Sequence, residues 1–241
     1  MISVVIPVID EATRLPKFLR RLADETTAHD VIVVDGGSAD DSVVIAITAG
    51  VRVLETAAGR GIQLHAGTDQ VMGDVILFLH ADSAFSAGGL AAIDAVLAAS
   101  LVLVGGNFRV VFDGEDGFSR WLTGFYAWFR GHGLYYGDSA SFVRTEAYRE
   151  LGGVKPSELM EDYEFSRRLE RHGKTICIAE PPLVTSSRRF HGRHPIAIVW
   201  GWIYIHALYY LGGTPRRLAR IYDPDRRRRT VTPTQKNCSP D

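Results

Sequence analysis

The chain has 241 residues, of which 46% are hydrophobic, 23% charged and 10% aromatic, and this excludes a disordered, collagen-like or low-complexity protein. Its net charge of −1 hides a basic region, because residues 186–229 contain ten arginines and only two aspartates. This asymmetry favours an anionic partner, either a phosphate group or a lipid surface, although the arginines at 226–229 could equally be a solubilising tail. The dense arginine cluster lies only at that end and no reader motif surrounds it, so we expect no nucleic-acid partner.

The first residues and the cysteines indicate the compartment. The N-terminal sequence MISVVIP lacks a basic region and enters a strand-like run at once, so we expect no secretory signal. Cys177 and Cys238 are too few for a disulfide framework or a cysteine-ligated zinc site. We therefore expect a protein of the reducing cytoplasm.

Four short apolar runs in the first half predict strands that are buried on both faces, as in a parallel sheet. They lie at residues 2–8, 31–34, 51–54 and 75–79. Segments with helical spacing of apolar residues separate them, at 15–22, 62–71 and 90–97. This order predicts an α/β fold with a Rossmann-like, mostly parallel central sheet flanked by helices.

The second half is less regular. We expect strands at 102–104, 107–112, 140–144 and 175–178, and helices at 118–129, 145–151 and 160–172. No internal repeat and no glycine/serine linker interrupts the chain, which favours one domain. Residues 195–215 contain no charged side chain, and the apolar run at 196–211 is shorter than the ~20 residues that span a bilayer. We interpret this run first as a packed core helix and second as an interfacial helix with aromatic residues at headgroup depth.

Polar residues follow three of the predicted strands: Asp10 and Glu11, then Asp35, then His80 and Asp82. Ligands of an open parallel sheet bind beyond the carboxyl ends of its strands, so these residues predict a common site. Asp35 could instead only cap a helix. His80 and Asp82 suit a divalent cation that holds a diphosphate, although such a pair alone is more often structural.

Asp162 lies on the apolar face of the predicted helix at 160–172, together with Phe165 and Leu169. A carboxylate there is costly unless it is paired, metal-bound or used as a general base. The alternative is a helix N-terminal carboxylate favoured by the macrodipole, which accounts well for Glu161. The loop at 59–63 opens a helix and suits a phosphate or a nucleotide. A dinucleotide-binding glycine pattern is missing after the first strand, which argues against hydride transfer.

Taken in order, these motifs resemble the family 2 glycosyltransferases, which have the GT-A fold. The resemblance rests on VVIPVIDE at 4–11, VVDGGSAD at 33–40, residues 59–67, FLHADS at 78–83, the glycines at 152–153 and MEDYE at 160–164. It covers about residues 1–180. The later segments, with TSSRRF at 185–190, are similar to a subgroup of radical-SAM/selenodomain-associated transferases.

The resemblance implies one GT-A domain at 1–222, with a nucleotide-binding half at about 1–110 and an acceptor and catalytic half at about 111–190. A helical C-terminal extension would follow at about 194–222, and then a basic, flexible tail at 223–241. The implied reaction is an inverting transfer from a nucleoside diphosphate sugar, with a UDP-sugar favoured, to a hydroxyl or phosphate acceptor.

The resemblance also implies a role for each motif residue. Asp162 would be the general base, and Asp82 would bind Mg²⁺ or Mn²⁺ with His80, which stands where the family has an Asp. Asp35 would accept the N3–H of uracil. The implied nucleotide-binding set is Pro7, Ile9, Glu11, Asp35, Arg60, Gln63 and Ala81. Near the diphosphate or acceptor we expect Glu161, Arg188, Arg189 and Asp138.

Two other functions remain open. The first is a sugar nucleotidyltransferase, although residues 10–14 lack the glycine-rich signature of that class. The second is a sugar-nucleotide-binding protein that lost transferase activity with the change to His80. The acceptor cannot be read from the motifs, but the aromatic stretch at 121–129 and the charge-free segment favour a lipid-like molecule. The protein would then be cytoplasmic and peripheral at the inner face of the membrane.

Overall fold

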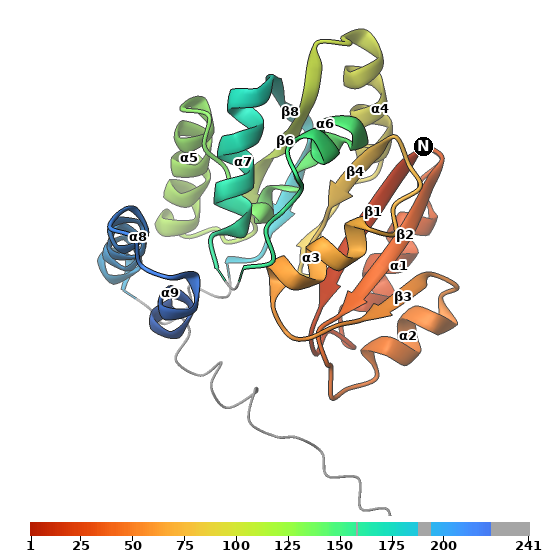
Figure 1. Ribbon diagram of the computed structural model, residues 1–241, viewed down its shortest axis with the longest axis horizontal. Helices are drawn as coiled ribbons and strands as arrows, with labels where there is room; N and C mark the ends of the chain where they lie inside the picture. Colours follow the sequence, from red (N-terminus) through yellow and green to blue (C-terminus); the bar gives the residue numbers. More distant parts are fainter. Residues whose placement is uncertain (158, 188–193, 223–241) are drawn as a thin grey trace, which may run out of the picture.

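A computed structural model describes residues 1–157, 159–187 and 194–222, without the side chains of 216, 220 and 222. Its centre is an eight-stranded sheet with the order β3-β2-β1-β4-β7-β6-β8-β5 (Figure 1). The strands are β1 Ile2–Val8, β2 His29–Asp35, β3 Arg52–Glu55, β4 Val75–Phe78, β5 Ser83–Ala84, β6 Leu103–Phe112, β7 Phe142–Arg144 and β8 Lys174–Thr185.

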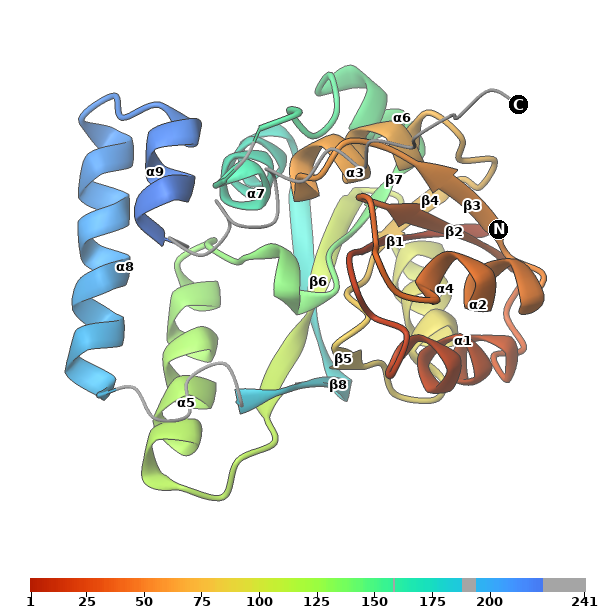
Figure 2. The ribbon, with the colours of Figure 1, turned by 90° about the horizontal axis from the view of Figure 1, so that it is seen from below.

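Helices cover both faces of the sheet. They are α1 Leu15–Ala23, α2 Ser42–Thr48, α3 Arg60–Thr68, α4 Gly89–Ala99, α5 Gly117–Gly131, α6 Thr145–Glu150, α7 Glu161–His172, α8 Pro195–Tyr210 and α9 Pro215–Tyr222, with a 3₁₀ turn η1 at Gly137–Ser139. Figure 2 shows α1, α2 and α4 on one side of the sheet and α3, α6 and α7 on the other. Successive residues of β1 pack against opposite helix layers, since Val4 and Ile6 join one core cluster and Val5 the other. The continuous apolar run of β1 therefore fills two cores at once.

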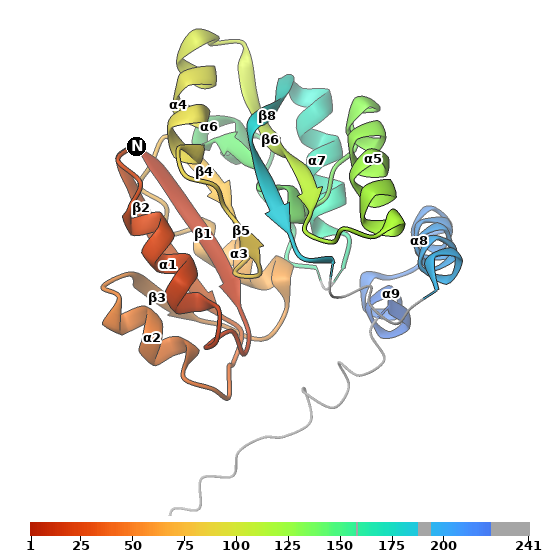
Figure 3. The same ribbon diagram turned by 180° about the vertical axis from the view of Figure 1, so that it is seen from behind.

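The expected α/β architecture is confirmed. β1 pairs in parallel with β2 and β4, and β2 pairs in parallel with β3. β7 is antiparallel to both of its neighbours, and β6 runs parallel to β8 as a long pair visible in Figure 3. Because β1, β2 and β4 are parallel, their carboxyl ends meet at one edge of the sheet, where α3 and α7 also begin (Figure 1).

The interpretation of residues 196–211 as a packed core helix is wrong. The segment is helical, but among the side chains of α8 only Ile198 and Ile205 are buried. An apolar sequence cannot by itself say whether the rest of the fold is large enough to cover it. In the described part of the chain, no helix has both the length and the apolarity to cross a membrane. The basic tail predicted at 223–241 lies outside the described residues.

Candidate active site

Asp35 ends β2 and closes the loop that follows. It is 2% exposed, and its Oδ2 accepts the N–H groups of Gly37 and Ser38 at 2.8 and 2.9 Å, while the Ser38 hydroxyl donates to Oδ1. These bonds order the loop after β2 and do not cap a helix, because α2 begins only at Ser42, so the capping interpretation of Asp35 is wrong. Its contact with a base stays a prediction. A carboxylate has about four acceptor positions and three are used here, so one position remains for that contact.

The loops after β1 and β2 are tied to each other. The Asp10 N–H donates to the Ser38 hydroxyl at 3.0 Å, and the Ala39 N–H donates back to Asp10 Oδ1 at 2.8 Å. Asp10 adopts a left-handed backbone with φ of 55°, which aspartate tolerates better than most residues. Glu11, a predicted nucleotide ligand, pairs with Arg14 at 2.6 Å. The two loops thus form one unit at the sheet edge, and Asp10, one of the predicted strand-end residues, holds them together.

The first turn of α3 connects this unit to the rest of the site. Gln63 is buried, and its amide nitrogen donates to the carbonyls of Val8 at 2.9 Å and Val34 at 2.7 Å. Both amide protons are therefore used at the ends of β1 and β2, and only the side-chain oxygen of Gln63 remains for the predicted nucleotide contact. Arg60, the first residue of α3, points to the other side and meets α7.

Arg60 holds two adjacent carboxylates at the start of α7. Its Nη2 lies 2.5 Å from Asp162 Oδ2, and its Nε donates to Glu161 Oε1. Asp162 also accepts the N–H of Gly137 through Oδ2 and that of Tyr163 through Oδ1, both at 2.7 Å. Glu161 Oε2 is buried and has no hydrogen-bond partner among the described residues. Asp162 is thus the better stabilised anion of the two.

The pKa values of the two carboxyls move in opposite directions. Burial pushes the pKa of Asp162 upward, but the charge of Arg60 and the N–H groups of Gly137 and Tyr163 outweigh it and hold that pKa below its usual value. Burial also raises the pKa of Glu161, and there Arg60 offsets the effect only in part. The site therefore favours the negative charge on Asp162 over that on Glu161.

His80, Asp82 and Asp138 complete the cluster. Burial lowers the pKa of His80, and Arg60 lowers it further, against the opposing charges of Asp82, Asp138 and Asp162. His80 is therefore a neutral imidazole at pH 7. Asp82 is exposed two residues further on. Asp138 lies in η1 and accepts the Tyr126 hydroxyl from α5 at 3.1 Å.

The donors fit a hard divalent cation that shares its coordination with phosphate oxygens. Within residues 1–157, 159–187 and 194–222, no three His, Cys, Asp or Glu side chains are grouped to hold a metal by themselves. Mg²⁺ and Mn²⁺ commonly take one or two protein ligands and complete their shell with water and substrate phosphates. The exposed Asp82 carboxylate suits Mg²⁺ or Mn²⁺ in that role, whereas an imidazole such as that of His80 is more typical of softer metal ions.

The structure brings together most of the residues that the motifs selected. One cluster contains Arg60, His80, Asp82, Asp138, Glu161 and Asp162. Asp35, Glu11 and Gln63 lie at or next to the ends of the neighbouring strands β1 and β2. Pro7 and Ile9, at the end of β1, are half-buried, and Ala81 is buried. Arg188 and Arg189 lie outside the described residues. The motifs missed the Gly137 N–H and the Tyr126 hydroxyl, because a backbone donor and a lone tyrosine carry no sequence signal.

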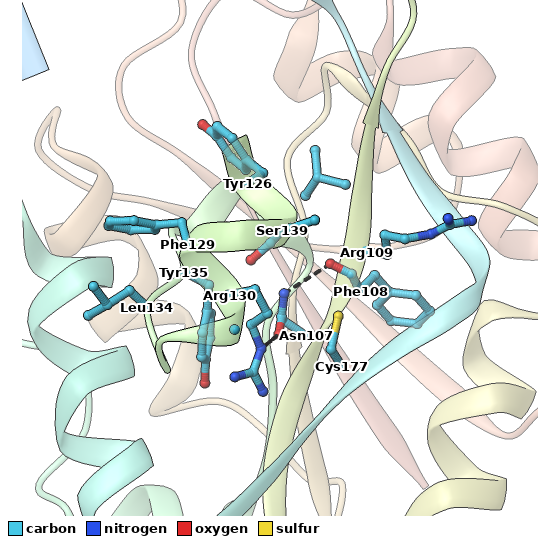
Figure 4. A pocket seen from close by; sticks show the side chains of 13 residues that line it. Asn107, Phe108, Arg109, Tyr126, Phe129, Arg130, Leu134, Tyr135, Ser139 and Cys177 are labelled. Atoms are coloured by element: carbon cyan, nitrogen blue, oxygen red, sulfur yellow. Dashed lines mark hydrogen bonds between the residues drawn. The ribbon is translucent and has the colours of Figure 1, made fainter. Parts of the chain in front are cut away.

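A cavity of about 370 Å³ lies beside this cluster, between β6 and α5 (Figure 4). Its lining includes Tyr126, whose hydroxyl donates to Asp138, and Ser139, which follows Asp138 in the chain. Among the described residues, two cations line the cavity. Arg130 is half-buried, donates to Asn107 Oδ1 at 2.5 Å and Thr175 Oγ1 at 2.8 Å and pairs with Glu170. Arg109 is exposed and pairs with Glu180 at 2.5 Å.

Comparison with known proteins identifies a family and a fold for this chain. A sequence profile described as glycosyl transferase family 2 matches residues 3–150. An undecaprenyl-phosphate 4-deoxy-4-formamido-L-arabinose transferase of Pseudomonas syringae pv. syringae is 38% identical in an alignment of 93 residues that covers 34% of this chain and 28% of that one. A 4,4'-diaponeurosporenoate glycosyltransferase of Staphylococcus haemolyticus is 32% identical over 34% of this chain and 24% of its own. The chain thus spans about a quarter of the length of these relatives.

Solved structures match over most of the chain. A mannosyltransferase of Pyrobaculum calidifontis in complex with GDP-Man and Mn²⁺ aligns with a TM-score of 0.66 at 16% identity, over 91% of this chain and 69% of that one. S. aureus TarS 1–349 in complex with UDP-GlcNAc aligns with a TM-score of 0.60 at 16% identity, over 81% and 60%. These matches confirm the GT-A type of fold. The likeness to the radical-SAM-associated subgroup stays a prediction.

Proposed function

The chain belongs to glycosyl transferase family 2, and we propose that it transfers a sugar from a nucleoside diphosphate sugar to an acceptor hydroxyl or phosphate with inversion at the anomeric carbon. The observation that carries this proposal is Asp162, ion-paired with Arg60 next to the buried Glu161 and close to His80 and Asp82, at the carboxyl edge of the parallel strands. Ligands of such sheets bind at that edge.

In the proposed reaction, Asp162 accepts the proton of the acceptor hydroxyl. The hydroxyl oxygen forms a bond to the anomeric carbon while the bond from that carbon to the diphosphate oxygen breaks, and the electron pair leaves with the diphosphate. Three N–H groups use three of the roughly four acceptor positions of Asp162, so one remains for the hydroxyl. Movement of Arg60 toward the diphosphate would free a second position and make Asp162 more basic.

Asp82 and His80 would hold the divalent cation. When bound, Mg²⁺ or Mn²⁺ supplies positive charge against the charge that develops on the leaving diphosphate. Arg60 is the one described cation of the cluster and supports the same charge from the α3 side. For the nucleotide we propose the strand-end set with Asp35 facing the base, which favours uracil, and a contribution from Arg188 and Arg189.

We propose a lipid-linked acceptor and a peripheral place on the cytoplasmic face of the membrane. Two relatives are named for lipid-like substrates, undecaprenyl phosphate and 4,4'-diaponeurosporenoate. The exposed aromatic side chains of α5 and α8 support the same class of acceptor, because they offer apolar surface to a lipid chain.

The test is release of the nucleoside diphosphate from a panel of UDP- and GDP-sugars, with and without Mn²⁺, by wild type, Asp162→Asn and the control Asp94→Asn. Asp94 is exposed on α4 and belongs to no part of the site. We expect Asp162→Asn to keep donor binding and to lose turnover by ~10²-fold or more, because the amide cannot accept the proton. Unchanged turnover would remove Asp162 from the mechanism. Donor binding without turnover for any sugar would favour a binding protein.

A further inference from the structure

Helix α8 is apolar around its whole circumference, and yet most of it is exposed. Residues 195–215 contain no Asp, Glu, Lys or Arg. One side of α8 packs inward through Ile198 and Ile205, and Trp202 stacks on Phe125 of α5 with ring centroids 5.9 Å apart. A helix that is hydrophobic all round is normally buried in a protein or in a membrane. The outer side of α8 therefore needs a partner other than water.

The exposed side chains form one stripe. Ile196, Trp200, Ile203 and Tyr204 follow helical spacing on the outer side of α8, and Trp200 is 64% exposed. Tyr210 and Leu211 continue the stripe, and Leu211 is 82% exposed. Figure 2 shows α8 along the outer edge of the molecule with α5 beside it. On α5, Trp121 and Trp128 are also exposed. We call these eight side chains the α5–α8 face.

A shallow apolar groove of about 340 Å³ opens within this face. It is lined by Phe118, Trp121, Pro195, Ile196, Val199 and Trp200, with hardly any polar surface. Contiguous exposed apolar surface of this kind marks an interaction site in a water-soluble fold. Tryptophan and tyrosine are the residues enriched where hydrocarbon meets lipid headgroups.

The charge of the segments that precede and follow α8 favours one kind of partner over another. Between residues 181 and 222 the sequence contains six arginines and no acidic residue. Three arginines precede α8 and three follow it within α9, so cationic segments bound the apolar helix at both ends. Each basic residue near an anionic bilayer contributes about 1 kcal/mol of attraction. A second copy of the chain on the same face would instead bring two arginine-rich segments together, which like charge opposes.

We propose that the α5–α8 face docks on an anionic phospholipid surface, with α8 lying in the plane of the interface. This inference rests on the proposed function in one respect: docking would bring the site to a lipid-linked acceptor. α8 is also joined to the site: the Tyr136 hydroxyl lies 3.1 Å from His206 Nε2, and the hydroxyls of Tyr163 and Tyr210 lie 2.7 Å apart. Tyr136 and Tyr163 are the direct neighbours of Gly137 and Asp162.

The experiment is co-sedimentation of the full chain with vesicles of phosphatidylcholine alone or mixed with phosphatidylglycerol. The test variant combines Trp200→Ser with Ile203→Ser. The matched control combines Val44→Ser with Ile47→Ser on α2, because both of those side chains are 61% exposed and lie far from α8 in the fold. We expect wild type and control to bind the mixed vesicles, binding to weaken with added salt, and the test variant to lose at least ~10-fold in affinity.

Absence of binding by wild type, or equal binding by the two double variants, would overturn the docking. Light scattering adds a further outcome: a wild-type dimer that the Trp200 and Ile203 changes convert to a monomer would assign the face to a second copy. The proposed activity is judged separately, by diphosphate release without vesicles. Asp162→Asn should bind vesicles like wild type, so a loss of docking and a loss of catalysis are distinguishable.

Discussion

At the scale of single residues, the site depends on how one guanidinium is divided between two carboxylates. Arg60 contacts both Glu161 and Asp162, but only Asp162 also receives two backbone N–H groups. In a buried setting one cation cannot stabilise two anions equally, so their pKa values move apart. Pairs of titratable groups separated in this way are typical of acid–base sites.

Replacing Arg60 with Met should therefore change both binding and pH dependence. Without the guanidinium, the donor diphosphate loses a charged partner, and we expect kcat/KM to fall by ~10²-fold. The strongest effect that lowers the pKa of Asp162 is then gone and burial raises it, so the acid limb of the pH–rate profile moves to higher pH. Arg60→Lys should restore part of the rate.

Arg52→Met is the control for that change, because Arg52 is ion-paired with Asp30 in another part of the fold. It should leave both the rate and the pH profile as in wild type. An acid limb in Arg60→Met that coincides with the wild-type limb would contradict the role given to Arg60. Steady-state rates over pH 4 to 9 provide the comparison.

The sequence predicted these residues better than their contacts. Asp162 and Arg60 were recognised from a helical face and from a loop that opens a helix, and both belong to the cluster. The hydrogen bond from the Gly137 N–H to Asp162 was not predictable, because the chain enters and leaves this region through two L-residues with positive φ, Ala140 at 50° and Met160 at 66°. Neither residue type signals that conformation, which costs energy wherever it occurs.

At the scale of elements, these two backbone positions set how η1 meets α7. Ala140 ends the 3₁₀ turn, and Met160 precedes the first helical residue, Glu161. The helix predicted from residue 160 therefore begins one residue later, at Glu161. The strand predicted from residue 140 begins two residues later, at Phe142. The two turns fix the Gly137 N–H against Asp162. The position of the Asp162 carboxylate therefore depends on how η1 is held against the start of α7.

Gly137→Ala should disturb that junction directly. An added Cβ would lie 3.0 Å from Asp162 Oδ2 and 3.1 Å from its Cβ, so the carboxylate has to move away from the Gly137 N–H. We expect kcat to fall by ~10-fold or more, since small displacements of a reacting group are costly, while donor binding changes little. Gly124→Ala is the control, because an added Cβ on α5 meets open space there and should stabilise the helix by about 0.5–1 kcal/mol. Equal kcat for the two variants would contradict the positioning role of Gly137.

At the scale of the whole molecule, the first half of the sheet was predictable and the second half was less so. The strands of the first half are short apolar runs between clear helices, as expected. Residues 102–112 were read as two strands, but β6 is continuous through Gly105 and Gly106. A Cβ at either glycine would clash with a carbonyl of the neighbouring strand, that of Phe142 or of Ile176. These glycines mark close strand approach rather than a turn, and one sequence cannot distinguish the two.

The exit from the sheet toward the C-terminal helices depends on Asp113 and gives a prediction about acid stability. Asp113 Oδ1 accepts the N–H and the hydroxyl of Ser187, at 2.7 and 3.0 Å, and so ties the end of β8 to the end of β6. The Ser187 N–H is the main cause that lowers the pKa of Asp113, and hydroxyl hydrogen bonds add to it, against the opposing effect of burial. Because the folded pKa lies below the unfolded value of about 3.9, this stabilisation is present at neutral pH and is lost as pH falls through the folded pKa.

Asp113→Asn keeps an oxygen acceptor but removes the charge. We expect it to lower the free energy of unfolding at pH 7 by about 1 kcal/mol, a modest value because Asp113 is exposed. The difference from wild type should persist to about pH 5 and then shrink below about pH 4, as wild type loses the same charge. Urea unfolding at pH 7, 5 and 3.5 measures this, with Asp94→Asn as the exposed control. A difference that stays constant down to pH 3.5 would show that Asp113 acts there through shape and not through its charge.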